Sequence, residues 1–527
     1  MESNSKHGVC FACVFGAALA LLCLSRPLAG ADLRASVEAF VAGRRPEILS
    51  ELVELLSIPN VAADRANIRR NAEALRGMLQ RRGLAAEILE TDGNPLVWGE
   101  RKIPGASRTL LFYLHYDGQP VDPSRWRQAS PFRPILRDGR MEEGAREIAE
   151  FSSRKELRDD WRIYARSASD DKSPIVALCA ALDALKAAGR EPSSNIRVIL
   201  DGEEEAGSVS LAPAIARYGE KLRANLVLIL DGPLHPSRRP TLTFGARGSV
   251  ALELMVYGPK FALHSGHYGN WVPNPAMRLA QLLGSMKDEQ GRVLIEGFYA
   301  GIPPLSPQER GILQQVPDEP AQLQKMFGIA RPDAVGENLQ EAIQYPSLNV
   351  RGLRSGYVGA DARTIIPAEA TAAIDIRLVK ETPSESMIQK VLAHIRKQGY
   401  EIVEKEPDDA TRLKHPKLVR VSIRRATEAY RTAMDLPESL LVAQALERTW
   451  GQTPVRIRTS GGTVPISQFI SALGCPAIGL PTVNFDNNQH SENENLRLGH
   501  FWNAIVSISA LLTLGVFGKI PILERGE

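Results

Sequence analysis

The stretch TLLFYLHYD, residues 109–117, decides the fold class of this chain. Its first six residues, Thr109 to Leu114, form a continuous apolar and aromatic run, typical of a strand that is buried on both faces. His115 and Asp117 follow directly, where the strand is expected to end. Ligand-binding residues of open α/β sheets gather at the carboxyl ends of the strands, so we expect a functional site at this point.

The same pattern recurs along the chain. Apolar runs predict further strands at Ile196 to Leu200 and Leu226 to Leu230. Helical periodicity predicts helices at Leu33 to Leu56, Ala66 to Arg82, Ser173 to Ala188 and Leu211 to Leu222. Such alternation of strands and helices predicts an α/β fold, with a parallel or mixed sheet covered by helices on both faces.

The pattern changes from Pro240 onward. Strands are predicted at Leu252 to Val256, Ala372 to Leu378 and Val419 to Ile423, and amphipathic helices at Pro275 to Met286 and Ser384 to Lys397. After about Tyr430 the alternation resumes, with Leu436 to Trp450, Cys475 to Leu480 and Phe501 to Leu514. We therefore interpret the middle part as a smaller α+β unit inserted into the first one.

Two stretches lack a clear pattern. Ile302 to Tyr345 is rich in Pro, Gln and Glu and shows no sustained apolar face. Met141 to Asp160 is rich in Glu, Arg and Lys, which is typical of a solvated surface insertion.

The first residues of the chain differ from the rest. Lys6 and His7 precede an apolar run from Val9 to Leu24, and Ala29 to Ala31 supplies small residues for cleavage, as in an export signal. As a helix, this 16-residue run is shorter than a bilayer crossing, so an uncleaved anchor is the weaker interpretation and no stable membrane insertion is expected after cleavage. We expect a periplasmic or secreted protein.

The length of 527 residues then divides into four parts: an export signal at 1–31, a catalytic domain at 32–242 and 431–527, and an inserted unit at 243–430.

The overall composition bears on which partners and which metal ligands the protein can use. Lys plus Arg (64) nearly cancel Asp plus Glu (61), so nothing in the overall charge favours a nucleic-acid partner. With nine histidines and five cysteines, any metal chemistry must rely on carboxylates.

Five polar clusters fall at predicted strand ends or beside a helix start. They are residues 115–117, 167–172, 201–208, Asp231 and 489–494. A dinuclear zinc site needs a shared carboxylate bridge, a terminal histidine and carboxylate for each ion, and one more carboxylate to accept the proton of a water. The adjacent Glu204 and Glu205 suit this division, because one can bind metal while the other stays free. Glutamate pairs are more often solvated surface, and single histidines are more often structural; the coincidence of all five clusters favours the site.

These clusters resemble, in order and over nearly the whole chain, the zinc metallopeptidases and deacylases that include carnosine dipeptidase, carboxypeptidase G, acetylornithine deacetylase and succinyl-diaminopimelate desuccinylase. The family's motifs are similar to His115-Tyr116-Asp117, Ser169-Asp170-Asp171-Lys172-Ser173, Glu204-Glu205-Ala206-Gly207-Ser208, His264-Ser265-Gly266 and His490-Ser491-Glu492-Asn493-Glu494. The segment 119–122, Gln-Pro-Val-Asp, resembles the dipeptidase branch.

The resemblance implies a role for each motif residue. Asp170 would bridge two metal ions, one also bound by His115 and Asp231 and the other by Glu205 and His490. Glu204 would be the general base and later acid, and Asp117 would orient His115. A cis peptide bond between Asp170 and Asp171 is also implied. The cofactor would be two Zn²⁺ per subunit, with Mn²⁺ or Co²⁺ equally acceptable to these ligands.

The resemblance further implies that the inserted unit is a lid and a dimerisation domain. His264 would reach the active site of the partner subunit in a homodimer and stabilise the oxyanion there. Arg377, Thr364 and the Gly461-Gly462-Thr463 loop would hold the substrate, with Arg377 suited to a free carboxylate. The alternative for Arg377 is an ion pair with Asp375 or a neighbouring strand.

Several positions depart from the family pattern. Ala165, Ser167, Ser173 and Asn270 stand where glycines are usual, and Thr459 stands where an arginine is frequent. None of these changes removes an expected ligand. They bear on the shape of the pocket and hence on the substrate.

The leading hypothesis is an exported dinuclear zinc peptidase that hydrolyses a peptide bond next to a free C-terminal carboxylate, as a dipeptidase or carboxypeptidase. It would act through a water activated between the two ions, with Glu204 as base. The long segment between His264 and Thr364 resembles the dipeptidase branch. An N-acyl-amino-acid amidohydrolase on the same site is the alternative, and a non-catalytic binding protein that kept the fold is the third possibility.

Overall fold

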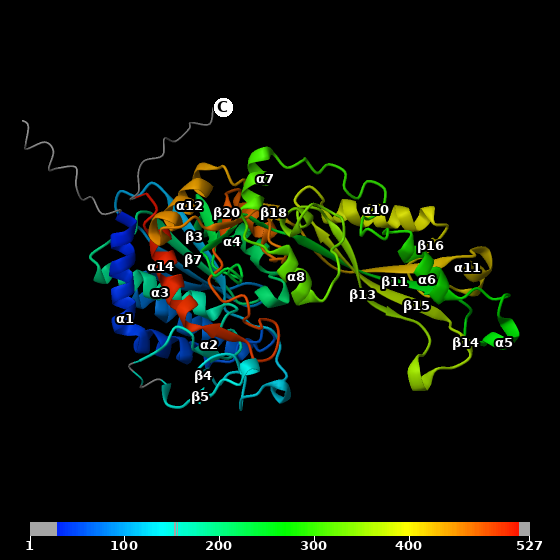
Figure 1. Ribbon diagram of the computed structural model, residues 1–527, viewed down its shortest axis with the longest axis horizontal. Coiled ribbons are helices and arrows are strands. Elements are labelled where there is room, and N and C mark those ends of the chain that lie inside the picture. Colours follow the sequence, from blue (N-terminus) through cyan, green and yellow to red (C-terminus); the bar gives the residue numbers. More distant parts are fainter. Residues whose placement is uncertain (1–28, 152–153, 155, 516–527) are drawn as a thin grey trace, which may run out of the picture.

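The computed structural model describes residues 29–151, 154 and 156–515. The predicted export signal therefore lies outside the described residues except for its last three positions, which begin helix α1 (Ala29–Leu56). None of the helices within the described ranges combines the length and the apolar character that crossing a bilayer requires. The described chain forms a larger and a smaller body, which lie side by side in Figure 1.

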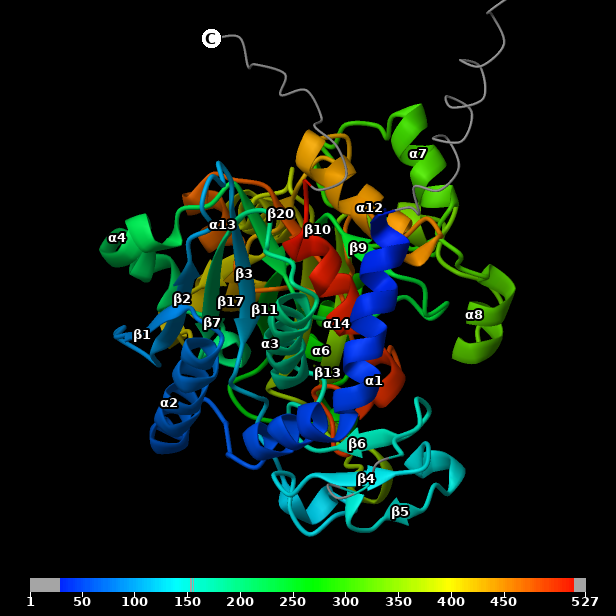
Figure 2. The same cartoon turned by 90° about the vertical axis from the view of Figure 1, so that its left-hand side faces the viewer.

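The larger body is built around a mixed eight-stranded sheet, with the strand order β1-β2-β7-β3-β8-β20-β9-β19 (Figures 1 and 2). Its strands are β1 (Ala85–Leu89), β2 (Leu96–Arg101), β3 (Thr109–His115), β7 (Asn195–Asp201), β8 (Leu226–Ile229), β9 (Thr241–Thr243), β19 (Val455–Ile457) and β20 (Ala477–Gly479). The neighbours β7, β3, β8 and β20 run parallel, whereas β1, β2 and β7 pair antiparallel. This sheet confirms the expected α/β class.

The alternation of side chains along β3 explains why helices cover both faces of the sheet. Leu110, Phe112 and Leu114 point into the main core, which α1, α3 and α14 share. Leu111 and Tyr113 point the other way, into a second core that α4 and α13 close. The helices of this body are α1, α2 (Arg65–Arg81), α3 (Lys172–Ala187), α4 (Leu211–Leu222), α12 (Pro437–Trp450), α13 (Ser467–Leu473) and α14 (Leu498–Leu512).

The smaller body holds a five-stranded sheet, with the order β13-β15-β11-β17-β16. Its strands are β11 (Gly248–Tyr257), β13 (Ser347–Arg354), β15 (Glu369–Leu378), β16 (Glu401–Val403) and β17 (Leu418–Thr427). Helices α6 (Pro275–Gly284) and α10 (Ser384–Lys397) cover one face, and α6 begins with the Asn274 side chain capping the first N–H groups. Beyond them lie α5 (Ser265–Tyr268), α11 (Asp409–Lys414) and the two-stranded pair β12 (Leu263–His264) and β14 (Ile365–Ile366).

The two featureless stretches have more structure than expected. Residues 302–345 contain three short helices, α7 (Pro307–Gln314), α8 (Pro320–Phe327) and α9 (Leu339–Ala342). Local capping explains α7, because Ser306 and Glu309 form a reciprocal capping box. The 141–160 stretch is mostly exposed but buries Met141 and Leu157 and includes β5 (Glu147–Ile148). That strand joins β4 (Ile135–Arg137), β6 (Arg162–Tyr164) and β21 (Asn495–Arg497) in a four-stranded sheet.

The path of the chain brings distant segments together. The five-stranded sheet is built within residues 248–427, whereas β19 and β20 return after it to pair with β9 and β8 of the large sheet. A short pair, β10 (Gly245–Ala246) and β18 (Tyr430–Arg431), lies where the chain leaves the larger body and comes back. The boundaries predicted at residues 31, 242 and 430 stay a prediction.

Candidate metal and active site

The site lies where three parallel strands end. His115 is the last residue of β3, and Glu204 and Glu205 lie in the 3₁₀ turn η4 (Glu204–Ala206) just after β7. Asp231 follows β8, and Asp170 directly precedes α3. Because β7, β3 and β8 are parallel neighbours, their carboxyl ends meet at one edge of the sheet.

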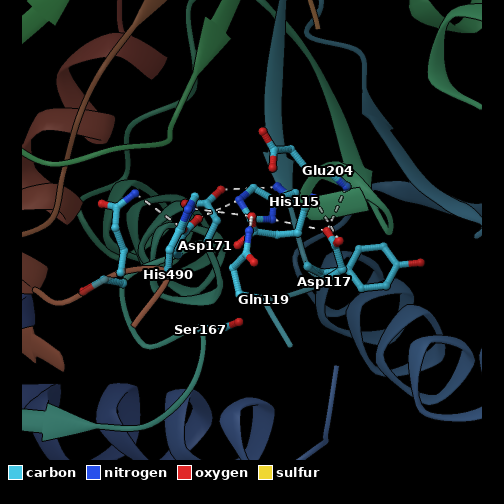
Figure 3. Close-up of polar contacts among 12 residues, drawn as sticks. His115, Asp117, Gln119, Ser167, Asp171, Glu204 and His490 are labelled. Carbon is cyan, nitrogen blue, oxygen red and sulfur yellow. Dashed lines mark hydrogen bonds and ion pairs between the residues drawn. The ribbon is translucent and has the colours of Figure 1, made fainter. Parts of the chain in front are cut away.

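Two groups of possible metal ligands share Asp170 there. His115, Asp170 and Asp231 form one group, and Asp170, Glu205 and His490 form the other; within each group the ligand atoms lie within 4.8 Å of one another. His115 Nε2 is 2.9 Å from Asp170 Oδ1, and His490 Nε2 is 3.0 Å from Asp170 Oδ2 (Figure 3). The structure thus brings together all five expected ligands, in the two sets that the family resemblance implies. Their roles as ligands stay a prediction.

Asp117 organises the turn beside the first group. Its two carboxylate oxygens accept the backbone N–H groups of Glu204 and Glu205, at 3.0 and 3.1 Å. One of these oxygens lies 3.4 Å from His115 Nδ1. Asp117 therefore holds both the histidine and the glutamate turn, as Figure 3 shows.

The pKa values of the site's side chains are typical of a site that binds cations. Burial, and then the charge of Asp170, raise the pKa of Glu205 to about 7 and that of Asp231 to about 6. Burial also raises the pKa of Glu204 well above its usual range. The hydrogen bond to Asp170 raises the pKa of His490 to about 9. Crowded carboxylates with raised pKa values mark a functional site, because each would be more stable beside a positive charge.

The donor set fits metal ions. It consists of imidazole nitrogens and carboxylate oxygens, with no sulfur, and each group offers three possible ligands. Such ligands accept zinc, manganese or cobalt alike. Glu204 belongs to neither group, although it sits next to Glu205 in the same turn.

A residue without an expected role, Glu494, supports the bridging aspartate. Its buried carboxylate accepts the backbone N–H groups of Ser167, Ser169 and Asp170 at 2.8 to 3.0 Å. It also pairs with Arg166 at 2.8 Å, and both side chains are almost fully buried. The sequence shows Glu494 only as the end of the His490 motif, and no pattern of neighbouring residues points to its contact with Arg166.

Two amides also contact the proposed ligands. Gln119 donates to Glu205 at 2.5 Å, and Gln489 donates to Asp170 at 3.3 Å. Both stand in motifs that the sequence points to, but neither was assigned a role. The expected cis peptide bond between Asp170 and Asp171 is present.

The residues expected to bind the substrate lie in two separate places. Arg377, on β15, donates to the Thr463 hydroxyl at 2.8 Å and contacts Asp375 at 3.3 Å, so the ion pair weighed as the alternative is also formed. Gly462 lies in the same loop, and its carbonyl accepts the backbone N–H of Arg247. These groups lie where the two bodies meet.

His264 and Thr364 lie elsewhere. Both are exposed, and the Thr364 carbonyl accepts the N–H of Ser265 beside the β12–β14 pair. In Figure 1, α5 and β14 mark the end of the smaller body that is farthest from β3 and β7. Within one chain, therefore, the structure does not bring His264 or Thr364 to the ligand groups.

Comparison with known proteins gives a family match. The model of a family described as Peptidase family M20/M25/M40 matches residues 111–513. The Cys-Gly metallodipeptidase DUG1 of Candida albicans is 25% identical over 489 residues, covering 89% of this chain and 94% of that protein. The Beta-Ala-His dipeptidase of Mus musculus is 26% identical over 416 residues, covering 78% and 77% of the two chains.

Solved structures show the same fold. The M20 family metallo-carboxypeptidase Sso-CP2 of Sulfolobus solfataricus superposes with a TM-score of 0.71 at 29% identity, covering 89% of this chain and 99% of that one. Human carnosine dipeptidase 1 has a TM-score of 0.69 at 22% identity, covering 91% and 98%.

Proposed function

The chain belongs to peptidase family M20/M25/M40 and is a peptide-bond hydrolase, and from this premise we propose that it cleaves the bond next to the free C-terminal carboxylate of a small peptide. Dipeptidase and carboxypeptidase names among its relatives and structural neighbours support this substrate class. The observation that carries the proposal is the pair of ligand groups sharing Asp170, with the free carboxylate of Glu204 beside them.

We propose a dinuclear site of zinc, with manganese or cobalt as the alternatives. Asp170 would hold both ions, His115 and Asp231 one of them, and Glu205 and His490 the other. When bound, the metal supplies Lewis-acid polarisation of the scissile carbonyl and of the attacking water. Gln119 and Gln489 would orient the carboxylates that they contact.

The protein's own groups then carry the proton. Glu204 would accept the proton of the attacking water and deliver it to the leaving nitrogen. Asp117 holds the backbone of this residue in place through the Glu204 N–H. Burial raises the pKa of Glu204 well above its usual range, which makes its carboxylate a stronger base toward the attacking water.

Arg377 and Thr463 would bind the peptide's C-terminal carboxylate. The Arg377 guanidinium is one-third exposed where the two bodies meet, and its bond to Thr463 fixes its direction. A guanidinium fork matches a carboxylate with two parallel hydrogen bonds.

His264 and Thr364 would act in the active site of a partner subunit. We propose that the chain is a homodimer in which the end of the smaller body reaches the other subunit's site, because this end lies far from the ligand groups of its own chain (Figure 1). We also propose that residues 1–31 direct export to the periplasm or outside the cell.

The test is a substrate panel. The protein, freed of metal with a chelator and reloaded with Zn²⁺, Mn²⁺ or Co²⁺, is assayed against a dipeptide library and against N-acetyl amino acids with the same C-terminal residues. Higher kcat/KM for the dipeptides is expected. Faster turnover of the N-acetyl amino acids would make the chain an amidohydrolase, and no turnover of either class would favour a binding protein.

A further inference from the structure

The five-stranded sheet of the smaller body has one polar face that is not covered by helices. Side chains alternate along β11 and β15, and Val250 and Ile376 point to the face buried under α6 and α10. The opposite face carries Ser249, Asp375 and Arg377, which are half-buried. Because Arg377 reaches Thr463 of the larger body, this polar face is turned toward the larger body.

The register places a second arginine on the same face. Ala251 of β11 pairs with Asp375 on one side and with Arg425 of β17 on the other. Residues directly opposite in an antiparallel pair share a face, so Arg425 lies in the same row as Asp375. A β-bulge beside Ala251 puts two arginines in succession at this point, and bulges commonly re-aim a side chain near an active site.

The two arginines of the bulge have different surroundings. Arg424 donates to Glu253 at 3.0 Å and so is neutralised within the sheet. Arg425 is exposed, and in the described part of the chain no hydrogen bond or ion pair engages it. An exposed arginine without an acidic partner is available to a ligand.

Arg425 lies against the turn that carries the proposed base. A methyl group placed on Gly207 would come within 3.0 Å of Arg425 Nη2, so the guanidinium rests on the backbone of this glycine. Gly207 ends the turn of Glu204 and Glu205, and its own φ of +102° also favours glycine. The Arg425 guanidinium therefore lies beside the turn that carries Glu204 and Glu205.

The spacing of the two arginines matches a small peptide. Arg377 and Arg425 are two strands and two residues apart on the sheet, which places their Cα atoms about 12 Å from each other. A dipeptide backbone spans about 7 Å. Both arginine side chains reach the larger body, Arg377 at Thr463 and Arg425 beside Gly207. One guanidinium can hold the C-terminal carboxylate while the other reaches a different group of the same peptide.

We propose that Arg425 determines specificity by binding an acidic side chain of the substrate, so that the protein prefers peptides containing aspartate or glutamate. This inference rests on the proposed peptidase function. A charge-assisted, bidentate contact of this kind is worth about tenfold to a hundredfold in kcat/KM over the uncharged isostere.

The experiment uses metal-loaded protein and matched dipeptides. Glutamate is compared with glutamine, and aspartate with asparagine, at each of the two positions, with kcat and KM measured separately. The wild type is expected to prefer one acidic series about tenfold to a hundredfold. Arg425→Gln should bring the acidic peptide down to its amide isostere, and Arg425→Glu should reverse the preference toward lysine peptides. Arg424→Gln is the matched control and should keep the acidic preference, because Arg424 already pairs with Glu253.

The outcomes separate this inference from the proposed function. Equal turnover of acidic and amide peptides by the wild type, or an unchanged preference in Arg425→Gln, would overturn the role of Arg425 while leaving the peptidase in place. A wild type that cleaves no dipeptide would overturn both. The melting temperature of each variant is measured. Equal turnover by the wild type overturns the role of Arg425 even where a variant fails to fold, and either Arg425 variant that folds tests the role where the wild type prefers acidic peptides.

Discussion

Ser167 shows how a replaced glycine is accommodated beside the proposed metal site. Its φ of +62° lies in the left-handed region, which costs a non-glycine residue about 1–2 kcal/mol. Its N–H donates to Glu494, and its hydroxyl accepts from Asn60 at 2.9 Å, so fixed hydrogen bonds offset this cost. Asn270, another replaced glycine, also takes positive φ, which asparagine tolerates better than most residues. Two of the four positions where glycines are usual, Ser167 and Asn270, thus keep a left-handed backbone.

The role of Glu204 as general base can be tested by replacing it with glutamine, which has nearly the same shape. Glu204→Gln is expected to lower kcat by about 10²- to 10⁴-fold, because the amide cannot take the proton of the attacking water. Metal content by mass spectrometry should stay at the wild-type level, since Glu204 belongs to neither ligand group. Glu492→Gln, at a half-buried glutamate paired with Arg125, is the control and should keep full activity. Retained activity in Glu204→Gln would rule out this base.

At the scale of elements, Glu494 ties the loop before β21 to the segment that leads into α3. Three backbone N–H groups and Arg166 converge on its carboxylate, which is fully buried. This single side chain therefore positions the Asp170 backbone between two elements that are more than 300 residues apart in sequence.

Removing the negative charge of Glu494 should destabilise the protein. In Glu494→Gln the amide NH₂ would face N–H donors, and the buried Arg166 would lose its counter-charge, at a cost of about 3–5 kcal/mol in the free energy of unfolding. Glu492→Gln, two residues away in a pair whose arginine is exposed, should cost much less. Chemical denaturation of the metal-free proteins gives both values. Equal losses in the two variants would contradict this role.

Helix α14 contains a buried histidine, His500, whose protonation should make the free energy of unfolding depend on pH. Neither ring nitrogen of His500 has a hydrogen-bond partner among the described residues. Burial, followed by the charges of Arg497 and Arg238, lowers its pKa to about 4. The usual value in an unfolded chain is about 6.5, so the unfolded state binds more protons between pH 4 and 6.5. The free energy of unfolding must therefore fall as the pH falls through this window, by up to about 3 kcal/mol from this group.

His500→Leu should remove this contribution. The difference in the free energy of unfolding between pH 7 and pH 4.5, measured by urea denaturation of the metal-free protein, is expected to shrink relative to the wild type. His415→Leu, at a histidine that is 28% exposed, should leave the difference unchanged. An unchanged difference in His500→Leu would show that this helix does not carry the acid sensitivity.

At the scale of the whole molecule, the two bodies divide the proposed machinery. The ligand groups lie in the larger body, whereas the smaller body carries Arg377 and Arg425 at one end and His264 at the other (Figure 1). A single chain can present Arg377 and Arg425 to its own site. We expect His264 to act in the site of a partner subunit.

Mixing two inactive variants tests the dimer. If His264 acts in the partner's site, subunits carrying His264→Ala and subunits carrying Glu204→Gln should complement each other after exchange. Each mixed dimer then has one site with both wild-type residues, so an equal mixture recovers about a quarter of wild-type activity. Light scattering measures the oligomeric state. No recovery from a mixture shown to contain mixed dimers would place His264 outside the partner's site.

Several features could be predicted from the sequence because their causes are local. The apolar run of β3 and the periodicity of α4 and α10 depend on neighbouring residues, and these elements form close to the expected ranges. The short helices of 302–345 were missed, because capping by residues such as Ser306 leaves no apolar periodicity to detect. The burial of Leu157 was missed because its partners are distant in sequence.

The sequence by itself determined the long helices and the buried strands, the order of the motifs and the kinds of donor atoms at the site. Only the tertiary structure decided that Asp170 lies between two ligand groups, that Glu494 holds its backbone and that Arg425 rests on Gly207. Each of these contacts joins segments from different strands or loops. Their distances follow from the packing and register of whole sheets, which no short stretch of sequence encodes.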